Sequence, residues 1–114
     1  MVDAETSVGQ LRARVAEFVQ ARAWERFHVP KDLAIALSIE ASELLEIFLW
    51  RDRGPPVDWP VDVRRAVADE LADVLIYGLS LANAVGLDVS DAIAAKLVQN
   101  EAKYPAERFR GRLP

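Results

Sequence analysis

Four acidic residues form two pairs with the same spacing, each in a stretch that carries almost no other charge. The pairs are Glu40 with Glu43, and Glu70 with Asp73. Residues 34–50 contain no lysine or arginine and only one further acid, Glu46. Residues 74–85 contain no charged residue at all. Positions three apart in sequence lie about 60° apart around an α-helix, so each pair is expected to share one face of an apolar helix.

The chemistry that suits such a set is the binding of a divalent cation. Four carboxylates gathered in a core of low dielectric repel one another, whereas one or two hard cations turn that repulsion into coordination. An oxygen-only ligand set favours Mg²⁺, with Mn²⁺ as the other possibility, because zinc and copper prefer His or Cys. A di-iron bundle would need Glu-x-x-His on two helices, and the single histidine, His28, lies outside both stretches.

A purely structural interpretation of the same acids stays open at this point. Glutamates three positions apart are common on ordinary helices, and nearby arginines could pair with them in ion pairs. The candidate arginines are Arg51, Arg53, Arg64 and Arg65.

The acids can only be brought together by helices, and local signals predict where these helices begin and end. We expect helices over residues 8–22, 31–50, 60–85 and 89–103. Ser7 followed by Gln10 has the pattern of a capping box for the first helix. Asp58 and Asp88 are the expected N-caps of the third and fourth helices, and Gly86 is the expected stop of the third.

The composition indicates a single all-α domain. The chain has 114 residues, 52% of them hydrophobic and 28% charged, and it shows no strand-type alternation. We assign residues 1–114 to one domain, with a core over about residues 7–105 and a basic tail at 106–114. The Gly- and Pro-rich loop before residue 61 joins two halves of one four-helix bundle-like protomer. Because a core of this size is small, we expect a homo-oligomer, either a dimer or a tetramer.

The composition argues against nucleic acid as a partner, against membrane contact and against export. The net charge of −4 argues against a nucleic-acid polymer as partner. No stretch reaches about 18 uninterrupted apolar residues, and the N-terminus lacks a leader pattern, so we expect no membrane contact and no export. Together with the absence of cysteine, this favours the cytoplasm.

Longer motifs surround the acids and extend over most of the chain. They are WERFHVP from residue 24, ALSIEASELLEIFLW from residue 36, DELADVLIY from residue 69 and K-x-x-x-N-x-x-x-Y-P from residue 96. Together they resemble the MazG-like superfamily of all-α nucleoside triphosphate pyrophosphohydrolases, and within it the dCTP pyrophosphatase branch. The resemblance covers about residues 24–105.

The resemblance implies a reaction and assigns roles to the acids. It implies cleavage of a nucleoside triphosphate to the monophosphate and pyrophosphate, in nucleotide-pool house-cleaning, with dCTP or a modified pyrimidine deoxynucleotide as substrate. The metal ligands and catalytic residues would be Glu40, Glu43, Glu70 and Asp73. We take Glu43 as the carboxylate that activates the water. The alternative is a non-catalytic helical module for nucleotide binding or assembly.

The resemblance also implies residues that bind the substrate. They are Trp24, His28, Trp50, Tyr77, Lys96 and Asn100. Lys96 and Asn100, one helical turn apart, would meet the phosphates, and the other four would shape the base and sugar pocket. Simpler roles stay open, because most tryptophans seal a core and most lysines are solvated.

Overall fold

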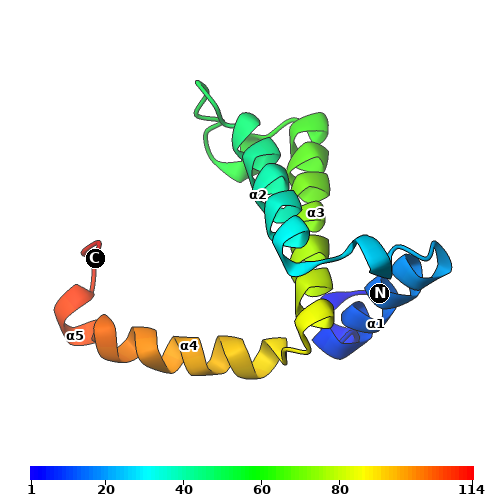
Figure 1. The fold of residues 1–114 in the computed structure, drawn as a ribbon. Coiled ribbons are helices and arrows are strands. Elements are labelled where there is room, and N and C mark those ends of the chain that lie inside the picture. The colour runs from blue at the N-terminus through cyan, green and yellow to red at the C-terminus, as the bar shows by residue number, and fades with distance from the viewer.

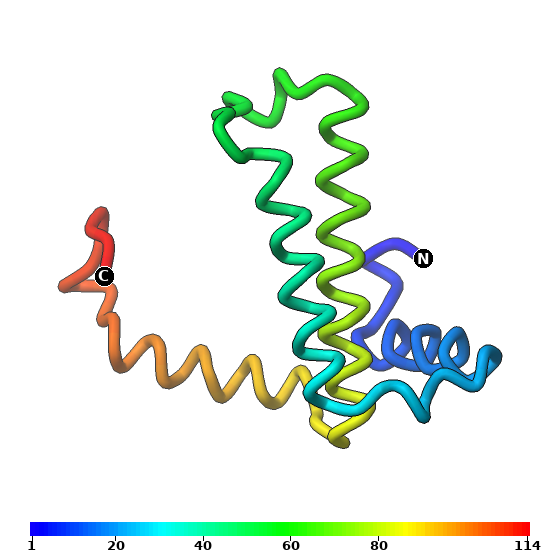
Figure 2. The backbone as a smooth tube through the Cα atoms, turned by 45° about the horizontal axis from the view of Figure 1, so that its top comes forward, coloured from blue at the N-terminus to red at the C-terminus, as the bar shows by residue number.

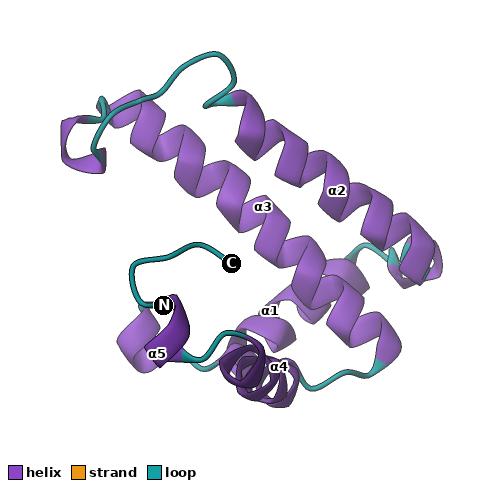
Figure 3. Ribbon diagram, turned by 90° about the vertical axis from the view of Figure 1, so that its left-hand side faces the viewer, coloured by secondary structure: helices purple, strands orange, loops and turns teal.

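Every regular element of the chain is helical. The computed structural model describes all residues from Met1 to Pro114, and Figure 3 shows helices joined by loops without any strand. The α-helices are α1 Val8–Ala21, α2 Pro30–Glu46, α3 Val61–Val85, α4 Val89–Lys103 and α5 Ala106–Phe109. There are three 3₁₀ turns: η1 Asp3–Glu5 precedes α1, η2 Glu25–Phe27 lies between α1 and α2, and η3 Pro56–Asp58 lies between α2 and α3. The predicted all-α class is confirmed.

The helices α2 and α3 form a long antiparallel hairpin, which is the main packed unit of the chain (Figure 1). Leu33, near the start of α2, is 2% exposed, and Val63, in the first turn of α3, is also buried. The connecting loop between Glu46 and Val61 closes one end of the hairpin. This pairing places the middle of α2 against the N-terminal half of α3, where the acidic pairs lie.

Most of the predicted helix boundaries are confirmed within one residue because their signals are local. The backbone N–H of Ser7 donates to Gln10 Oε1 at 2.7 Å, and Ser7 Oγ accepts from the N–H of Gln10 at 3.1 Å, which completes the capping box. Asp88 caps α4 by accepting from the N–H of Asp91 at 2.9 Å. Gly86 ends α3 in the left-handed conformation, at φ 69°.

One predicted cap and one predicted boundary are wrong. Asp58 does not cap α3, because it lies inside η3 and Pro60 occupies the N-cap position without a side-chain cap. The residue before a proline is driven away from the helical region, so Trp59 is extended and the helix can only begin after it.

The second correction concerns α2, which ends at Glu46 and not at Trp50. Residues 47–50 continue as turns, and Trp50 takes a left-handed φ of 64°. Arg53 Nε donates to the carbonyl oxygen of Ile47 at 2.8 Å, so a side chain from the loop satisfies one of the free carbonyls at this helix end.

The helix α1 lies across the C-terminal half of α3, at the end of the hairpin opposite the connecting loop (Figure 2). Arg12 Nε donates to Asn83 Oδ1 at 3.0 Å, and Asn83 Nδ2 donates to the carbonyl oxygen of Arg12 at 3.2 Å. Val19 and Ala82 are buried in these two helices. This two-way hydrogen bonding fixes α1 against α3.

The helix α4 leaves the rest of the chain at the end of α3. Its direction differs from that of α3 by 104°, and it extends away from the α2–α3 hairpin (Figures 1 and 2). At its far end, Tyr104 and Phe109 stack edge to face at 5.3 Å, which folds the short α5 against it. One chain therefore does not form the expected bundle of four helices, because α4 lacks a helix of the same chain along its side.

The buried core of the single chain is very small. Only five of the 114 residues are buried, namely Val19, Leu33, Val63, Ser80 and Ala82. Many large apolar side chains on α2, α3 and α4 are exposed, including Ile39, Leu75 and Ile93, each more than half exposed. No helix by itself has both the length and the apolar character to cross a membrane, and only α3 with α4, bent by 104°, reach those limits together.

Candidate metal centre

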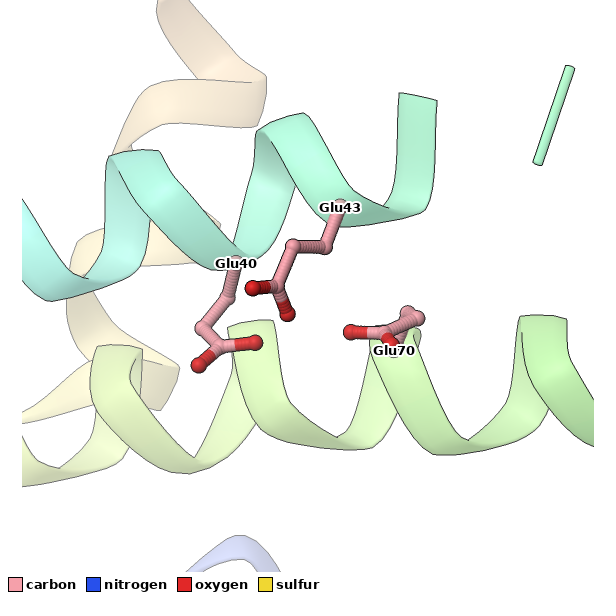
Figure 4. Close-up of side chains that lie close together, drawn as sticks. All are labelled: Glu40, Glu43 and Glu70. Atoms are coloured by element: carbon pink, nitrogen blue, oxygen red, sulfur yellow. The ribbon is translucent and has the colours of Figure 1, made fainter. Parts of the chain in front are cut away.

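Three of the four predicted carboxylates converge between α2 and α3. Glu40 and Glu43 extend from α2 toward α3, and Glu70 extends from α3 toward them (Figure 4). One oxygen from each carboxylate lies within 4.8 Å of those of the other two. The three-residue spacing on α2 and the antiparallel packing of the hairpin together produce this arrangement.

The cluster holds buried negative charge without a compensating partner. Glu40 and Glu70 are half-buried, and the Oε2 atom of each is buried without any hydrogen-bond partner. Glu43 is the exposed member of the group. Buried polar atoms in folded proteins are nearly always paired, so two orphaned carboxylate oxygens at one place indicate a missing positive group.

Arginine does not supply that positive group. The one ion pair of the chain joins Arg14 and Glu17 on α1, at 3.6 Å. Arg53 and Arg64, two of the candidate arginines, donate instead to backbone carbonyls, at 2.8 and 2.9 Å. The structural ion-pair interpretation of the acids is therefore wrong for this chain.

The pKa values of the acids reflect the same crowding. The pKa of Glu40 is raised from 4.5 to about 7, mainly because the protonated form can donate a hydrogen bond to the nearby Glu43 carboxylate. Burial and the negative charges of Glu43, Asp73 and Glu70 add to this effect. The pKa of Glu70 is also raised, first by burial and then by the charge of Glu43. A divalent cation would reverse these shifts by favouring the ionised forms.

The residues fit a hard divalent cation. All three donors are carboxylates, which matches the oxygen preference of magnesium, manganese and calcium. Asp73, the fourth predicted ligand, is not part of the close group, although its charge contributes to the raised pKa values of Glu40 and Glu70. It lies on α3 three residues after Glu70 and is exposed, so its role as a ligand stays a prediction.

The predicted base-pocket residues are not gathered in one place. Trp24 and His28 lie at the corner between α1 and α2, where Trp24 meets the ring of Phe18 edge to face at 5.8 Å. Tyr77 is half-buried in the middle of α3. Trp50 lies beyond the other end of α2 and is 93% exposed, so the role of sealing the core is wrong for this residue.

The predicted phosphate-binding residues lie on α4, away from the carboxylates. Lys96 Nζ contacts Gln99 Oε1 at 3.5 Å, and Asn100 accepts at its backbone carbonyl from the N–H of Tyr104 at 2.7 Å. Asp73 is twelve residues before the end of α3, which is about 18 Å at 1.5 Å per residue. Since α4 then turns by 104°, Lys96 is not brought to the carboxylates of its own chain.

A cavity lies between α1, η2 and α3, and His28 is the one predicted site residue in its wall. Its volume is about 320 Å³. Its lining residues are Ala16, Val19, Gln20, Glu25, His28, Ser80, Asn83 and Ala84. One sequence signal could have located part of it: Ser80 follows Asp73 by seven residues, or two helical turns, and so lies on the same face of α3.

Two antiparallel helices present facing carboxylates with orphaned oxygens and no cationic side chain, so this all-helical protein carries a site that could hold a metal ion. Residues 35–112 match the MazG-like family, and this match covers the hairpin, the carboxylates and α4. The chain belongs to the MazG-like family.

Named relatives agree with this membership. The chain is 40% identical to dCTP pyrophosphatase 1 of Mus musculus over 109 residues and 39% identical to that of Homo sapiens over 108 residues. These matches cover 94% and 93% of the chain, which spans 64% of the length of each relative. A solved pyrophosphatase from Archaeoglobus fulgidus is 36% identical, with a TM-score of 0.76 over 92% of this chain and 98% of that one.

Proposed function

We propose that the chain is a magnesium-dependent nucleoside triphosphate pyrophosphohydrolase. It would convert a (deoxy)nucleoside triphosphate and water to the monophosphate and pyrophosphate, with dCTP or a modified pyrimidine deoxynucleotide as substrate. The observation that carries the proposal is the carboxylate group of Glu40, Glu43 and Glu70, with two buried oxygens that lack a partner. The names of the relatives support both the reaction and the choice of dCTP.

The chain's residues divide the work between holding the ion and moving a proton. Glu40, Glu43, Glu70 and Asp73 would hold the cation, and Glu43, the exposed member of the close group, would also accept the proton of the attacking water. The water oxygen attacks the α-phosphorus, the bond to the bridging oxygen breaks, and pyrophosphate leaves. A bound Mg²⁺ would supply charge neutralisation and make the attacking water more acidic. Mn²⁺ has the same ligand preference and would replace it.

The phosphate contacts proposed for α4 would come from a second copy of the chain. Lys96 and Asn100 would meet the phosphates, while Trp24, His28, Trp50 and Tyr77 would surround the base and sugar. Because α4 extends away from its own hairpin, Lys96 can only reach a carboxylate group on another copy. We therefore propose a homo-oligomer in which α4 of one copy lies against the hairpin of the next.

The exposed apolar surface supports this assembly. Leu97 and Val98 on α4 are 54% and 65% exposed. A groove of about 500 Å³ lies at the corner of α3 and α4, and nine of its eleven lining residues are hydrophobic. A monomeric protein seldom exposes apolar side chains on this scale. A second copy offers matching surfaces, since α2 and α3 expose Ile39 and Leu75 in the same way.

Pyrophosphate release from a panel of deoxynucleoside triphosphates, with and without Mg²⁺, tests the proposed reaction. We expect release from dCTP only when the metal is present. Glu43→Gln should lower kcat at least roughly a hundredfold, because it removes the base, and should leave the melting temperature unchanged. If no triphosphate is split at any Mg²⁺ or Mn²⁺ concentration, the alternative of a non-catalytic nucleotide-binding or assembly module takes its place.

A further inference from the structure

Three arginines lie beyond α4 and take no part in the candidate metal centre. Arg108 belongs to α5, and Arg110 and Arg112 follow it. All three are exposed, and none of their side chains makes a hydrogen bond or an ion pair within the chain. We call these three residues the arginine tail.

The arginine tail has a fixed position at the far end of α4. The rings of Tyr104 and Phe109 pack edge to face with their centroids 5.3 Å apart, and the backbone N–H of Phe109 donates to the carbonyl oxygen of Pro105 at 3.0 Å. These contacts hold α5 against α4, away from the hairpin of the same chain (Figures 1 and 2). The hairpin of its own chain therefore does not supply a counter-charge for the tail.

The hairpin and the tail carry opposite charge. Residues 30–85 have ten acidic and five basic side chains, a net charge of −5. Residues 103–114 have four basic side chains and one acidic side chain, a net charge of +3. Opposite charges of this kind attract two surfaces and select which faces meet. A second copy of the chain therefore offers the tail an anionic surface.

An exposed line of acids on α3 is the part of the hairpin that fits the tail. Asp62 and Asp69 are seven residues apart, about two helical turns, so they share one face of α3. Both are exposed, and neither has an ion-pair partner, although Arg65 lies between them in the sequence. Asp73 continues the same face toward the metal centre. We call Asp62 and Asp69 the acidic stripe.

The proposed phosphate contact of α4 determines which part of the next hairpin the tail meets. If Asn100 of one copy lies beside Glu70 of another, the tail begins eight residues beyond it, at Arg108. Asp62 is eight residues before Glu70, so the tail of an antiparallel α4 reaches the acidic stripe. A parallel α4 would place the arginines beside residues 74–85, which carry no charge. Burying guanidinium groups there without a partner is unfavourable, so the charges favour the antiparallel direction.

We propose that the arginine tail of one copy docks on the acidic stripe of another copy and fixes α4 antiparallel to α3 of that copy. The inference rests on the proposed function for the position of Asn100 beside the carboxylates. Nucleic acid is the other polyanion that an arginine tail can bind. The net charge of −4 opposes that partner, so a second copy of the chain is the occupant that fits.

Charge reversal tests the contact in the full chain. Arg110→Glu should raise the dissociation constant of the oligomer about tenfold in sedimentation velocity at low salt, because an attraction becomes a repulsion. The wild-type dissociation constant should also rise with added salt. Lys31→Glu is the matched control, since it makes the same charge change at an exposed position at the opposite end of the hairpin from Asp62. Equal dissociation constants for these two variants would overturn the inference.

A second reversal locates the partner surface. Asp62→Arg alone should weaken association about as much as Arg110→Glu. The chain that carries both changes should recover most of the wild-type affinity, because opposite charges then face each other again. Losses that simply add in the combined variant would overturn the assignment of Asp62. Both positions are exposed, so neither reversal disturbs a buried contact.

Two further measurements separate this inference from its alternatives. Pyrophosphate release from dCTP is followed for the wild type. A chain that hydrolyses dCTP but associates equally in every variant overturns the inference and leaves the proposed reaction intact. Association that responds as expected in a chain that hydrolyses no triphosphate supports the inference and removes the reaction. Binding of a labelled oligonucleotide that Arg110→Glu abolishes, with association unchanged, would overturn the inference in favour of nucleic acid.

Discussion

The Glu40 carboxyl makes the stability of the chain without metal depend on pH. Its pKa of about 7 arises from Glu43, burial and the neighbouring acids, and the pKa of Glu70 is raised in the same direction. Between pH 4.5 and about 7, the folded chain without metal holds a proton on Glu40 that the unfolded chain has released. The folded state therefore binds more protons than the unfolded state over this range. By linkage, the contribution of these acids to the free energy of unfolding falls as the pH rises.

This sign gives the first prediction. We expect the free energy of unfolding, measured in urea with a chelator present, to contain a contribution from Glu40 that decreases as the pH rises from 4.5 to 7. The Glu40→Gln variant lacks the titrating group, so its unfolding free energy should fall less steeply than that of the wild type. Glu46→Gln, an exposed acid on the same helix, should keep the wild-type slope. Parallel curves for all three proteins would contradict the raised pKa of Glu40.

At the scale of the helix, the left-handed residue at the end of α3 sets the direction of α4. Gly86 has a φ of 69°, and a Cβ added there would meet no atom within 4 Å. The cost of a side chain at this position is therefore backbone strain and not a clash, about 1–2 kcal/mol for an L-residue in the left-handed region.

The second prediction follows from this strain. Gly86→Ala should lower the free energy of unfolding by about 1–2 kcal/mol in urea denaturation at fixed protein concentration. Gly9→Ala is the matched control, because Gly9 lies inside α1 and its added Cβ would make only an ordinary contact with Ser7 Oγ at 3.7 Å. That variant should be unchanged or more stable by about 0.5 kcal/mol. Equal stabilities for the two variants would show that φ at position 86 is not constrained.

The sequence predicted those helix boundaries that depend on neighbouring residues. Three signals act within four positions of the boundary that they set, so the sequence alone predicts them: the Ser7–Gln10 capping box, Gly86 and Asp88. The end of α2 was predicted too late, because no glycine or asparagine marks the C-terminus of this helix. The left-handed conformation of Trp50 could not be expected either, since an aromatic residue rarely takes it.

The candidate metal site was also predicted from local spacing, whereas the cavity was not. The carboxylates were predicted because their spacing places them on helix faces that must meet when two apolar helices pair. The cavity was not predicted, because its walls depend on how α1 crosses α3. Arg12 and Asn83, which fix that crossing, are 71 residues apart, and neither belongs to a recognisable motif. Gly86 marked where α3 ends, but the angle at which α4 leaves was not predicted, because no helix of the same chain packs along α4.

At the scale of the whole molecule, the apolar face of α4 should control association. Ile93 on α4 is 55% exposed and lines the groove at the corner of α3 and α4. We predict that Ile93→Glu shifts the oligomer toward smaller species in sedimentation velocity, because a charge would have to be buried at the interface. Val57→Glu places the same charge at an 85% exposed position in η3 and should assemble normally. Identical sedimentation of the two variants would remove α4 from the interface.

Mixing two inactive variants distinguishes a shared site from a site built within one copy. Glu43→Gln lacks the base on the hairpin, and Lys96→Ala lacks the phosphate contact on α4. Suppose that α4 of one copy completes the site on the hairpin of another copy. A site formed by the hairpin of the Lys96→Ala chain and α4 of the Glu43→Gln chain then contains both Glu43 and Lys96. After random exchange of equal amounts, about a quarter of all sites meet this condition, so pyrophosphate release should recover to about that share of wild type. A site within one copy would always lack one of the two groups, and the mixture would then stay as inactive as its separate components.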